Sequence, residues 1–387
     1  MDITIHPRRL RGDITVIPSK SQAHRLFICA AFADGPTKLI CPEISNDILA
    51  TIGCLQALGA QISKIPSGYL VIPTAKIPHK ATLPCAESGS TLRFLLPIAG
   101  ALGVEATFLM EGRLPQRPLS PLWEEMERMG CRLSRPTPDT VRCTGKLLPG
   151  VYTIAGNVSS QFITGLLLAF ALMDGESSLE ITGKLESAPY VEMTKDALSL
   201  FAGRHSPGTV TVEGDWSNGA FFLAAQSLGS SVTTRNLNPH SSQGDRAVAS
   251  LLPKLRQHCT ISAADIPDLV PILAVTAACS QGAVFTDIRR LRMKESDRVA
   301  STIAMLEALG GKAEATEDTL TVYGTGLIGG TVDAVNDHRI AMSAAIASTV
   351  CKEPVTILGA RCVDKSYPRF WEEFTRLGGY YEQYLRR

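Results

Sequence analysis

Residues 292–311 read RMKESDRVASTIAMLEALGG, and this stretch indicates how the whole chain is organised. Five of its first seven residues are charged, and the rest has the apolar spacing of an amphipathic helix, with Val299, Ile303 and Leu306 on one face. We expect Gly310 to end this helix, because glycine adopts the left-handed C-cap conformation without strain. Charge at the start of a helix is typical of a solvated first turn. The chain repeats the design, however, which suggests a further role.

The composition indicates a globular protein with room for two or three domains. The chain has 387 residues, of which 45% are hydrophobic and 19% charged, and its formal net charge is +1. Near-neutral charge argues against binding nucleic acid or a membrane surface through a broad positive field. The N-terminus has no apolar run of signal-peptide length, and the longest apolar stretch, near residues 162–173, is too short to span a bilayer. Ten cysteines without a CxxC pair are typical of free, mostly buried thiols in a reducing cytoplasm, the expected location.

Helices that end at a glycine recur along the chain. We expect such ends at Gly59, Gly130, Gly203, Gly310 and Gly378, while one further helix, residues 248–256, lacks the glycine. Successive ends lie roughly 50 to 70 residues apart, which indicates an internal repeat with loops of variable length. Paired strands are expected after these helices, for example at residues 61–64 with 69–72 and at 312–315 with 319–323.

A second kind of helix alternates with the first and is apolar almost all round. A helix of that kind must be buried. The six candidates are residues 24–33, 91–102, 162–173, 220–228, 269–279 and 340–350. The repeating unit is therefore a buried helix, a strand, a half-exposed helix and two more strands.

The repeats predict two similar α/β domains. The sixth unit has only residues 380–385 for its last two strands, and a spare strand at residues 3–5 could complete it. We therefore expect one domain at residues 18–212 and a discontinuous one at residues 1–17 and 213–387, each with three βαβαββ-type units and joined by a two-stranded hinge. An open solenoid is the alternative, but solenoids seldom bury one helix of every unit on all sides.

Cations gather where the buried helices begin. Helix N-termini present free N–H groups and a positive dipole end, so they bind anions, and Arg or Lys beside them suits phosphate or carboxylate groups. Ser, Asn and Asp at these positions are ordinary caps, but capping does not require the cations. The cations near helix starts are Lys20, Arg25, Arg93, Arg117, Lys294, Arg298, Arg339 and Lys365. We expect a small polyanionic ligand between the two halves rather than nucleic acid, because no aromatic residues interleave with the cations.

Two carboxylates lie among these cations. Asp268 begins a buried helix, and Glu295 lies between Lys294 and Arg298. Each is either a charge-balancing partner or a general acid–base group, and the sequence pattern leaves both open. The scattered histidines and cysteines do not have metal-site spacing, and no GxSxG or P-loop sequence occurs.

Ten motifs that run in order along the chain resemble the 5-enolpyruvylshikimate-3-phosphate synthase family. They are SKSQAHR, ESGSTLR, QRP, NVSSQF, SAPY, EGDWSNGAFF, IPD, RMKESDR, NDHRIAM and DKSYP. The resemblance implies two inverse α/β domains of three repeats each. It also implies transfer of the enolpyruvyl group of phosphoenolpyruvate to the 5-hydroxyl of shikimate 3-phosphate, with release of phosphate and without metal or cofactor, by a protein expected to be a monomer.

The resemblance also implies roles for particular residues. Asp268 would take the hydroxyl proton, Glu295 would handle the methylene proton, and Lys20 and Lys294 would steady the charged intermediate. The contacts to shikimate 3-phosphate would be Ser21, Arg25, Ser159, Ser160, Gln161, Ser187 and Tyr190, with Asp268 and Lys294. The contacts to phosphoenolpyruvate would be Lys20, Gly89, Ser90, Arg117, Gln161, Arg298, Arg339 and Lys365.

Two alternative functions and a closing motion of the two domains remain to be considered. The sibling family that acts on UDP-N-acetylglucosamine has a catalytic Cys five residues before the arginine matching Arg117, where this chain has Gly112. A non-catalytic repeat scaffold would not need Lys20, Asp268 and Glu295 together. We also expect the two cation-rich halves to repel each other when empty and to close on shikimate 3-phosphate.

Overall fold

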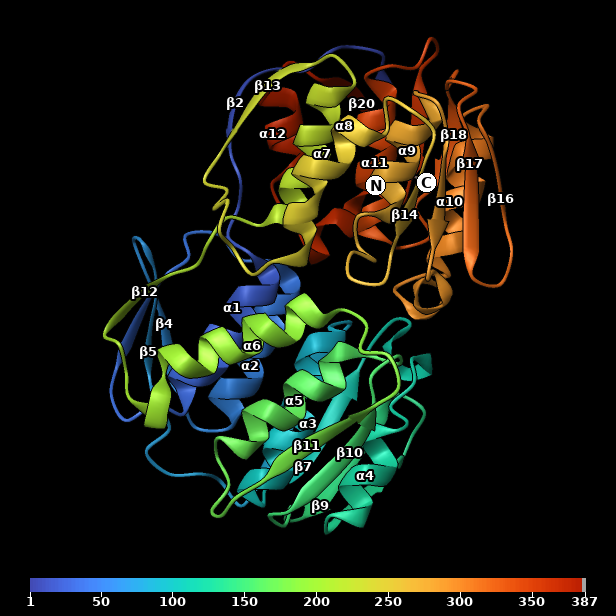
Figure 1. The fold of residues 1–387 in the computed structure, drawn as a ribbon. Helices are drawn as coiled ribbons and strands as arrows, with labels where there is room; N and C mark the ends of the chain where they lie inside the picture. Colours follow the sequence, from blue (N-terminus) through green and yellow to red (C-terminus); the bar gives the residue numbers. More distant parts are fainter. Residues whose placement is uncertain (385–387) are drawn as a thin grey trace. The chain divides into compact units, whose positions relative to one another are not determined.

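The computed structural model describes residues 1–384 and divides the chain into two units (Figure 1). The N-terminal unit consists of residues 18–213. The C-terminal unit consists of residues 1–17 and the chain from Gly214 onward, so the backbone passes between units at Ile17–Pro18 and at Glu213–Gly214. Each unit has its own hydrophobic core.

The N-terminal unit alternates helices with strands. Its helices are α1 (Lys20–Ala31), α2 (Asn46–Ala57), α3 (Gly89–Leu102), η1 (Leu114–Gln116), α4 (Leu122–Arg128), α5 (Ser160–Phe170), α6 (Ala188–Leu200) and η2 (Ala202–Arg204). Its strands are β3 (Thr37–Ile40), β4 (Gln61–Ile65), β5 (Gly68–Ile72), β6 (Lys80–Ala86), β7 (Glu105–Met110), β8 (Cys131–Ser134), β9 (Thr140–Gly145), β10 (Val151–Ala155), β11 (Ser178–Thr182) and β12 (Thr209–Thr211). They form sheets of order β6-β7-β9-β8, β12-β3-β5-β4 and β10-β11.

The C-terminal unit repeats this arrangement. Its helices are α7 (Trp216–Ser227), η3 (Gly244–Ala247), α8 (Val248–Lys254), α9 (Val270–Ala278), η4 (Arg289–Met293), α10 (Arg298–Ala308), α11 (His338–Ser348), η5 (Ala360–Lys365) and α12 (Phe370–Arg376). Its strands are β1 (Asp2–His6), β2 (Arg11–Thr15), β13 (Ser231–Arg235), β14 (Cys259–Ser262), β15 (Ala283–Thr286), β16 (Lys312–Ala315), β17 (Thr319–Tyr323), β18 (Gly330–Asp333), β19 (Val355–Leu358) and β20 (Tyr380–Tyr384). The sheets have the orders β14-β15-β17-β16, β18-β19-β1-β20 and β13-β2.

The predicted repeat is present, and the spare N-terminal strand completes the last one. β1 lies between β19 and β20 and is antiparallel to both, with Ile3 opposite Ile357 and Gln383. In each four-stranded sheet the first two strands are parallel and the remaining pairs antiparallel, as in the order β14-β15-β17-β16.

One repeat in each unit is shorter than we expected. Within residues 1–384, the repeats built on α5 and α7 keep only the two parallel strands β10-β11 and β2-β13. The strand that follows α6, β12, pairs with β3 and completes the first sheet of its unit instead. In each unit, one sheet is therefore completed by a strand that is far from its partners in sequence.

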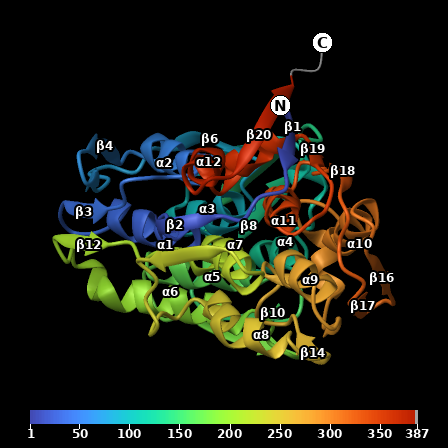
Figure 2. The ribbon, with the colours of Figure 1, turned by 90° about the horizontal axis from the view of Figure 1, so that it is seen from above.

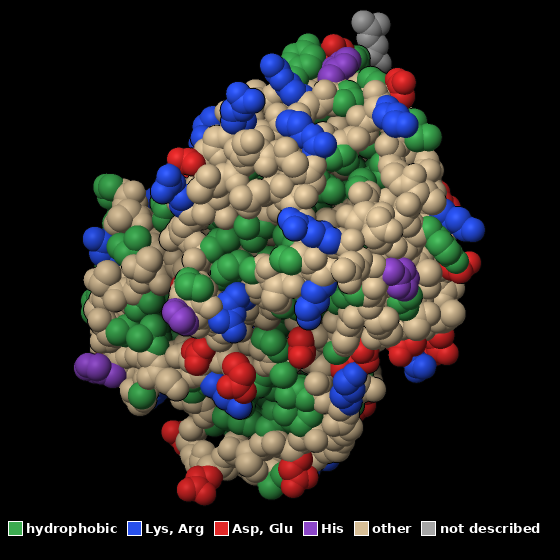
Figure 3. Space-filling view, turned by 45° about the horizontal axis from the view of Figure 1, so that its top comes forward, with side chains coloured by type: hydrophobic (Ala, Val, Ile, Leu, Met, Phe, Trp, Pro, Cys, Tyr) green, Lys and Arg blue, Asp and Glu red, His purple; other side chains and the backbone are tan. Residues whose placement is uncertain are grey.

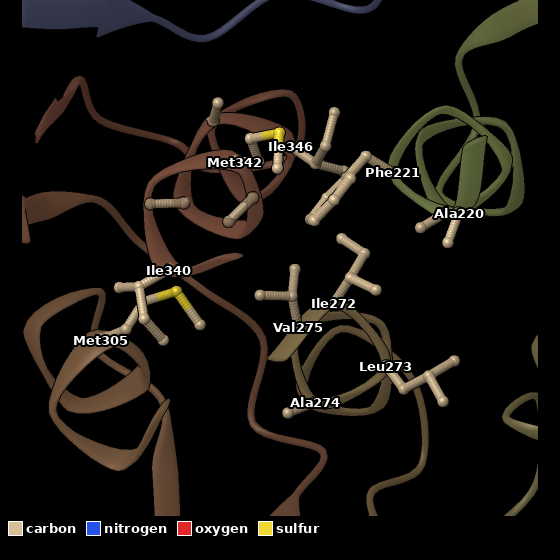
Figure 4. Close-up of a cluster of buried hydrophobic side chains, with 14 of the residues drawn as sticks. Ala220, Phe221, Ile272, Leu273, Ala274, Val275, Met305, Ile340, Met342 and Ile346 are labelled. Atoms are coloured by element: carbon tan, nitrogen blue, oxygen red, sulfur yellow. The ribbon is translucent and has the colours of Figure 1, made fainter. Parts of the chain in front are cut away.

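The helices predicted to be buried form the centre of each unit. All nine residues of α9 and all eleven of α11 are buried. In Figure 4, Phe221 of α7, Ile272 of α9 and Ile346 of α11 point toward one another, and Figure 2 shows these three helices side by side. Burying apolar side chains stabilises the fold by about 25 cal/mol for each Å² removed from water. Polar groups on these helices therefore gather at their ends.

Candidate active site

The starts of the buried helices carry polar side chains, as the sequence predicts. Ser19, Ser88, Ser159, Asp215 and Asp337 each accept a hydrogen bond from a backbone N–H in the first turn of the following helix. These five residues are N-caps, which satisfy donors that the helix itself cannot pair. Asp268 differs, because α9 starts with Leu269 as its cap and the Asp268 side chain is directed to cations instead.

Arg298, the first residue of α10, joins three carboxylates in the C-terminal unit. Its Nη1 lies 2.7 Å from Oδ1 of Asp268, its Nη2 2.5 Å from Oε2 of Glu295, and its Nε 3.0 Å from Oδ2 of Asp337. The Arg298 side chain is 1% exposed, whereas those of Asp268 and Glu295 are 21% and 23% exposed. The buried guanidinium of Arg298 thus positions two carboxylates that are themselves partly exposed to solvent.

Asp268 is the point where the cations of this unit meet. Lys294 Nζ lies 3.6 Å from Oδ1 of Asp268, and Nη2 of Arg339 donates to Oδ2 at 3.5 Å. Burial by itself raises the pKa of the Asp268 carboxyl, but the charges of Lys294, Arg339 and Arg298 outweigh it and hold that pKa well below its usual range. Asp268 is therefore ionised at neutral pH.

Formal charge balances within this cluster. The three cations are Lys294, Arg298 and Arg339, and the three carboxylates are Asp268, Glu295 and Asp337. Burial lowers the pKa of the Lys294 ammonium even though Asp268 opposes the shift. The cations of this unit are already paired with acids. The repulsion that we expected between two cation-rich faces is therefore weaker than the sequence suggests.

A further acid, Asp245 of η3, lies close to this cluster and was missed by the sequence argument. It is 3% exposed, and burial, then the charge of Asp268, raises its pKa to about 7. Lys365, by contrast, donates to the backbone oxygen of Asn336 at 2.8 Å in the loop before α11. The structure brings Lys294, Arg298 and Arg339 together around Asp268.

In the N-terminal unit, Lys20 is also paired with an acid. Its Nζ lies 2.9 Å from Oδ2 of Asp47 at the start of α2, and both side chains are 16% exposed. A chain of buried hydrogen bonds fixes the helices behind this pair. It runs from His24 Nδ1 to Thr51 Oγ1 at 2.7 Å, and from there to Thr91 at 2.7 Å. The starts of α1, α2 and α3 are therefore held together.

Gln161, at the start of α5, connects to the start of α3. Its Nε2 donates to Ser90 Oγ at 3.0 Å, and its Oε1 accepts from Arg93 Nη1 at 3.1 Å. The guanidinium of Arg117 lies against Gly89, since an added Cβ there would be 2.7 Å from Arg117 Nη1. The structure thus brings Gly89, Ser90, Arg117 and Gln161 to one place, and it gives Arg93 the role of positioning Gln161.

Arg25 lies deeper than the sequence suggested. It is 2% exposed and donates to Thr194, Thr164, the Ser21 backbone oxygen and the Tyr190 backbone oxygen at 2.6 to 3.1 Å. Burial lowers the pKa of its guanidinium to about 10. Arg25 therefore ties α1 to α5 and α6 in this structure.

The remaining predicted residues lie at helix starts around Arg25. Ser159 caps α5 by accepting from the Gln161 N–H at 3.3 Å, and Ser160 is the buried first residue of that helix. Ser187 precedes α6 with a left-handed backbone (φ 57°), which costs a non-glycine residue roughly 1 kcal/mol or more. Tyr190 follows in the first turn of α6.

Sequence reasoning missed the acidic partners. Asp337 belongs to the NDHRIAM motif, where the sequence predicts a helix cap, and the structure confirms that role. Its additional bond to Arg298 leaves no pattern in the sequence. Asp47 lies in the first turn of α2 and Asp245 in the short helix η3, and neither has a recognisable spacing from the cations near it. Ion pairs between residues distant in sequence become visible only in three dimensions.

Gly112 has no room for a side chain. Its backbone is left-handed (φ 55°), and an added Cβ would lie 2.3 Å from Oε2 of Glu87. A cysteine at this position would have to displace the Glu87 carboxylate and adopt a strained backbone. The Glu87 carboxylate therefore lies against the position that holds the catalytic Cys in the sibling family.

Among residues 1–384, no helix is long and apolar enough to cross a membrane, and no three His, Cys, Asp or Glu side chains are grouped to hold a metal ion. The ten cysteines are free thiols, seven of them buried. On the face drawn in Figure 3, Lys and Arg side chains are dispersed among acidic and apolar groups.

Comparisons with known proteins agree over the whole chain. The family model described as EPSP synthase (3-phosphoshikimate 1-carboxyvinyltransferase) matches residues 5–265 and 253–374. A relative with the name 3-phosphoshikimate 1-carboxyvinyltransferase from Clostridium novyi is 38% identical, over 99% of both chains. The relative of the same name from Clostridium kluyveri is also 38% identical, over 97% of both. The solved EPSP synthase from Acinetobacter baumannii has a TM-score of 0.80 at 24% identity, covering 99% of this chain and 100% of that one.

Proposed function

The chain belongs to the EPSP synthase family, and from that membership we propose its reaction. It transfers the enolpyruvyl group of phosphoenolpyruvate to the 5-hydroxyl of shikimate 3-phosphate, giving 5-enolpyruvylshikimate 3-phosphate and phosphate. This is a transferase step of the shikimate pathway, which leads to chorismate and the aromatic amino acids. Full-length similarity to relatives with that name supports the assignment.

One observation in the structure carries the proposal furthest. A single ionised carboxylate, Asp268, is contacted by Lys294, Arg298 and Arg339, and Glu295 shares Arg298 with it. Two accessible carboxylates among cations suit a reaction that moves protons between two anionic substrates. A structural ion-pair cluster would not need its acids to remain about one-fifth exposed.

We assign removal of the hydroxyl proton to Asp268. In the free protein its low pKa makes it a weak base, because three cations stabilise the charged form. Substrate phosphates and carboxylates would compete for those cations. Each cation drawn away from Asp268 raises the pKa of its carboxyl, so the base becomes stronger when the substrates are bound.

We assign proton transfer at the methylene carbon of phosphoenolpyruvate to Glu295. Carbon 2 of an enol phosphate becomes electrophilic only when carbon 3 is protonated to a methyl group, and that methyl group must lose a proton when phosphate departs. One acid–base group can serve both steps. Lys294 and Lys20 stabilise the charges of the intermediate, each from a position beside a carboxylate, Asp268 and Asp47 respectively.

Substrate binding involves further residues in each unit. We propose that phosphoenolpyruvate is held by Lys20, Gly89, Ser90, Arg117, Gln161, Arg298, Arg339 and Lys365. We propose that shikimate 3-phosphate is held by Ser21, Arg25, Ser159, Ser160, Gln161, Ser187, Tyr190, Asp268 and Lys294. Arg25 uses four of its five N–H donors inside the protein, so one N–H of Nη1 is left for shikimate 3-phosphate.

The test compares acceptors. Purified protein and phosphoenolpyruvate are mixed with either shikimate 3-phosphate or UDP-N-acetylglucosamine, and released phosphate is measured. We expect release with shikimate 3-phosphate only. Release with the nucleotide sugar would show the sibling activity, which the filled space at Gly112 disfavours. No release with either acceptor would indicate a non-catalytic scaffold.

We also propose that the enzyme works as a monomer in the cytoplasm. All of the residues assigned above come from one chain, and ten free thiols suit a reducing compartment. Light scattering after size-exclusion chromatography tests the first point, since a monomer has a mass of 41.5 kDa. A mass of twice that value would contradict it.

A further inference from the structure

The N-terminal unit contains a cavity that is not lined by any of the residues assigned above. Its volume is about 520 Å³, within the range typical of small-molecule sites. It lies where α1, α5 and α6 end, lined among others by Phe32, Leu172 and Phe201. The proposed substrate contacts of α1 and α5 lie at their N-termini. At 1.5 Å per residue, the twelve residues of α1 separate its two ends by roughly 16 Å.

Most of the lining is apolar and incompletely covered. Ile28 and Leu168 form the buried part of the wall, while Phe32, Leu172 and Leu198 are only partly buried. Apolar surface left in water costs about 25 cal/mol per Å² relative to burial. A bulky apolar group that fills this cavity would recover part of that free energy.

Two opposite charges line the same cavity. Arg204, at the end of η2, and Asp174, after α5, are both exposed lining residues. Within residues 1–384, no ion pair or side-chain hydrogen bond joins either of them to another residue or to each other. Their charged groups are therefore more than 4.0 Å apart, and each is available to a ligand.

The helix ends add to this pattern. The C-terminus of a helix carries the negative end of its dipole, and the final carbonyls here are bonded to backbone N–H groups, as Cys29 O is to Phe32 and Phe170 O is to Met173. Three helices end at this cavity. Together with Asp174 they favour a cationic group, while Arg204 favours a carboxylate in bidentate geometry.

We propose that this cavity binds a small zwitterion with a bulky apolar side chain, of the α-amino-acid class. The apolar side chain fills the cavity, the carboxylate pairs with Arg204, and the ammonium group pairs with Asp174 in the negative field of the helix ends. A purely apolar molecule would leave both charges unpaired, and an apolar carboxylate would place a negative charge near Asp174. This site is independent of the proposed reaction.

Titration calorimetry with the full chain tests the proposal. The probes are L-phenylalanine and L-leucine, compared with glycine, 3-phenylpropionate and phenethylamine, which lack the side chain, the ammonium group and the carboxylate respectively. We expect the two apolar amino acids to bind at least about fivefold more tightly than each of the three incomplete probes. Equal binding of 3-phenylpropionate or phenethylamine would overturn the zwitterion assignment, and so would an absence of binding by both amino acids.

Variants locate the binding. Arg204→Gln and Asp174→Asn should each weaken binding of L-phenylalanine at least about fivefold, and Ala171→Trp should block it by filling the cavity. The matched controls are Arg132→Gln on β8 and Asp196→Asn on α6, exposed residues of the same unit that do not line the cavity. Binding that survives Ala171→Trp, or that the controls weaken equally, would place the ligand elsewhere and refute the proposal.

Discussion

The buried bond between Arg298 and Asp337 should make a measurable contribution to the stability of the C-terminal unit. Asp337 is 0% exposed and accepts hydrogen bonds from Arg298 Nε at 3.0 Å, Ser296 Oγ at 3.0 Å and the Arg339 N–H at 2.9 Å. Asp337→Asn keeps the size of the side chain and an oxygen that can cap α11. It removes the negative charge, and its amide presents two donors where Arg298 also presents donors.

The size of the effect follows from burial. Removing one partner of a buried ion pair costs about 3–5 kcal/mol, because the other charge is left without compensation. Arg298 keeps Asp268 and Glu295, so we expect a smaller loss, about 2–4 kcal/mol. Asp297→Asn is the matched control. Asp297 caps α10 in the same way, but its pair with Arg292 is 3.4 Å long and its side chain is 40% exposed, so we expect about 0–1 kcal/mol.

Urea denaturation measures both variants. Trp216 and Trp371 belong to the C-terminal unit and Trp123 to the N-terminal one, so both variants are made in a Trp123→Phe background. Tryptophan fluorescence then reports on the C-terminal unit, and circular dichroism follows the whole chain. Where the two signals differ, the units unfold separately and the fluorescence transition is the relevant one. If both variants lose the same stability to within about 0.5 kcal/mol, the buried network does not stabilise the unit and our reasoning is wrong.

Four further predictions concern activity, binding and pH. Glu295→Gln should lower turnover at least about tenfold and leave the affinity for shikimate 3-phosphate unchanged. The control Glu307→Gln, on the exposed side of α10, should keep full activity. Near-normal turnover of Glu295→Gln would mean that Glu295 only balances charge. Arg117→Lys keeps the charge but loses the planar fork, so binding of phosphoenolpyruvate should weaken by about 1–3 kcal/mol, measured as its Michaelis constant. Asp245→Asn should raise the melting temperature more at pH 8 than at pH 5. The folded-state pKa of Asp245 is raised to about 7, so the folded protein loses stability as the pH rises from the unfolded value of about 3.9, and an equal gain at both pH values would contradict this. Finally, small-angle scattering should show a smaller radius of gyration with saturating shikimate 3-phosphate, and an unchanged radius would count against closure.

Local patterns predicted the elements of the fold well. The helix expected after Arg298 is α10, where Val299 and Leu306 are fully buried and Ile303 packs against the core. Strand pairs such as β16 and β17 have the predicted bounds, because alternation and turn residues are local signals. The spare N-terminal strand was predicted by counting strands, and β1 completes the last sheet.

The prediction was incomplete where distant segments meet. Nothing in residues 209–211 indicates that β12 joins β3, some 170 residues earlier, rather than a strand of its own repeat. The site shows the same limit. The sequence and its family resemblance listed the cations, but the acids that neutralise them, Asp47 and Asp337, come from other parts of the chain. The sequence therefore predicted which cations belong to the site, but not that carboxylates neutralise them.

The position of β1 has a consequence for how the protein is made. β1 leaves the ribosome about 350 residues before its neighbours β19 and β20. At about 5–20 residues per second, the strand waits roughly 20 to 70 s for its partners, with Ile3 and Ile5 unburied. The N-terminal unit has all of its strands between residues 37 and 211, so it can fold while synthesis continues. A nascent chain that stalls before β19 therefore keeps β1 as an unpaired apolar strand, available to a neighbouring chain or to a chaperone.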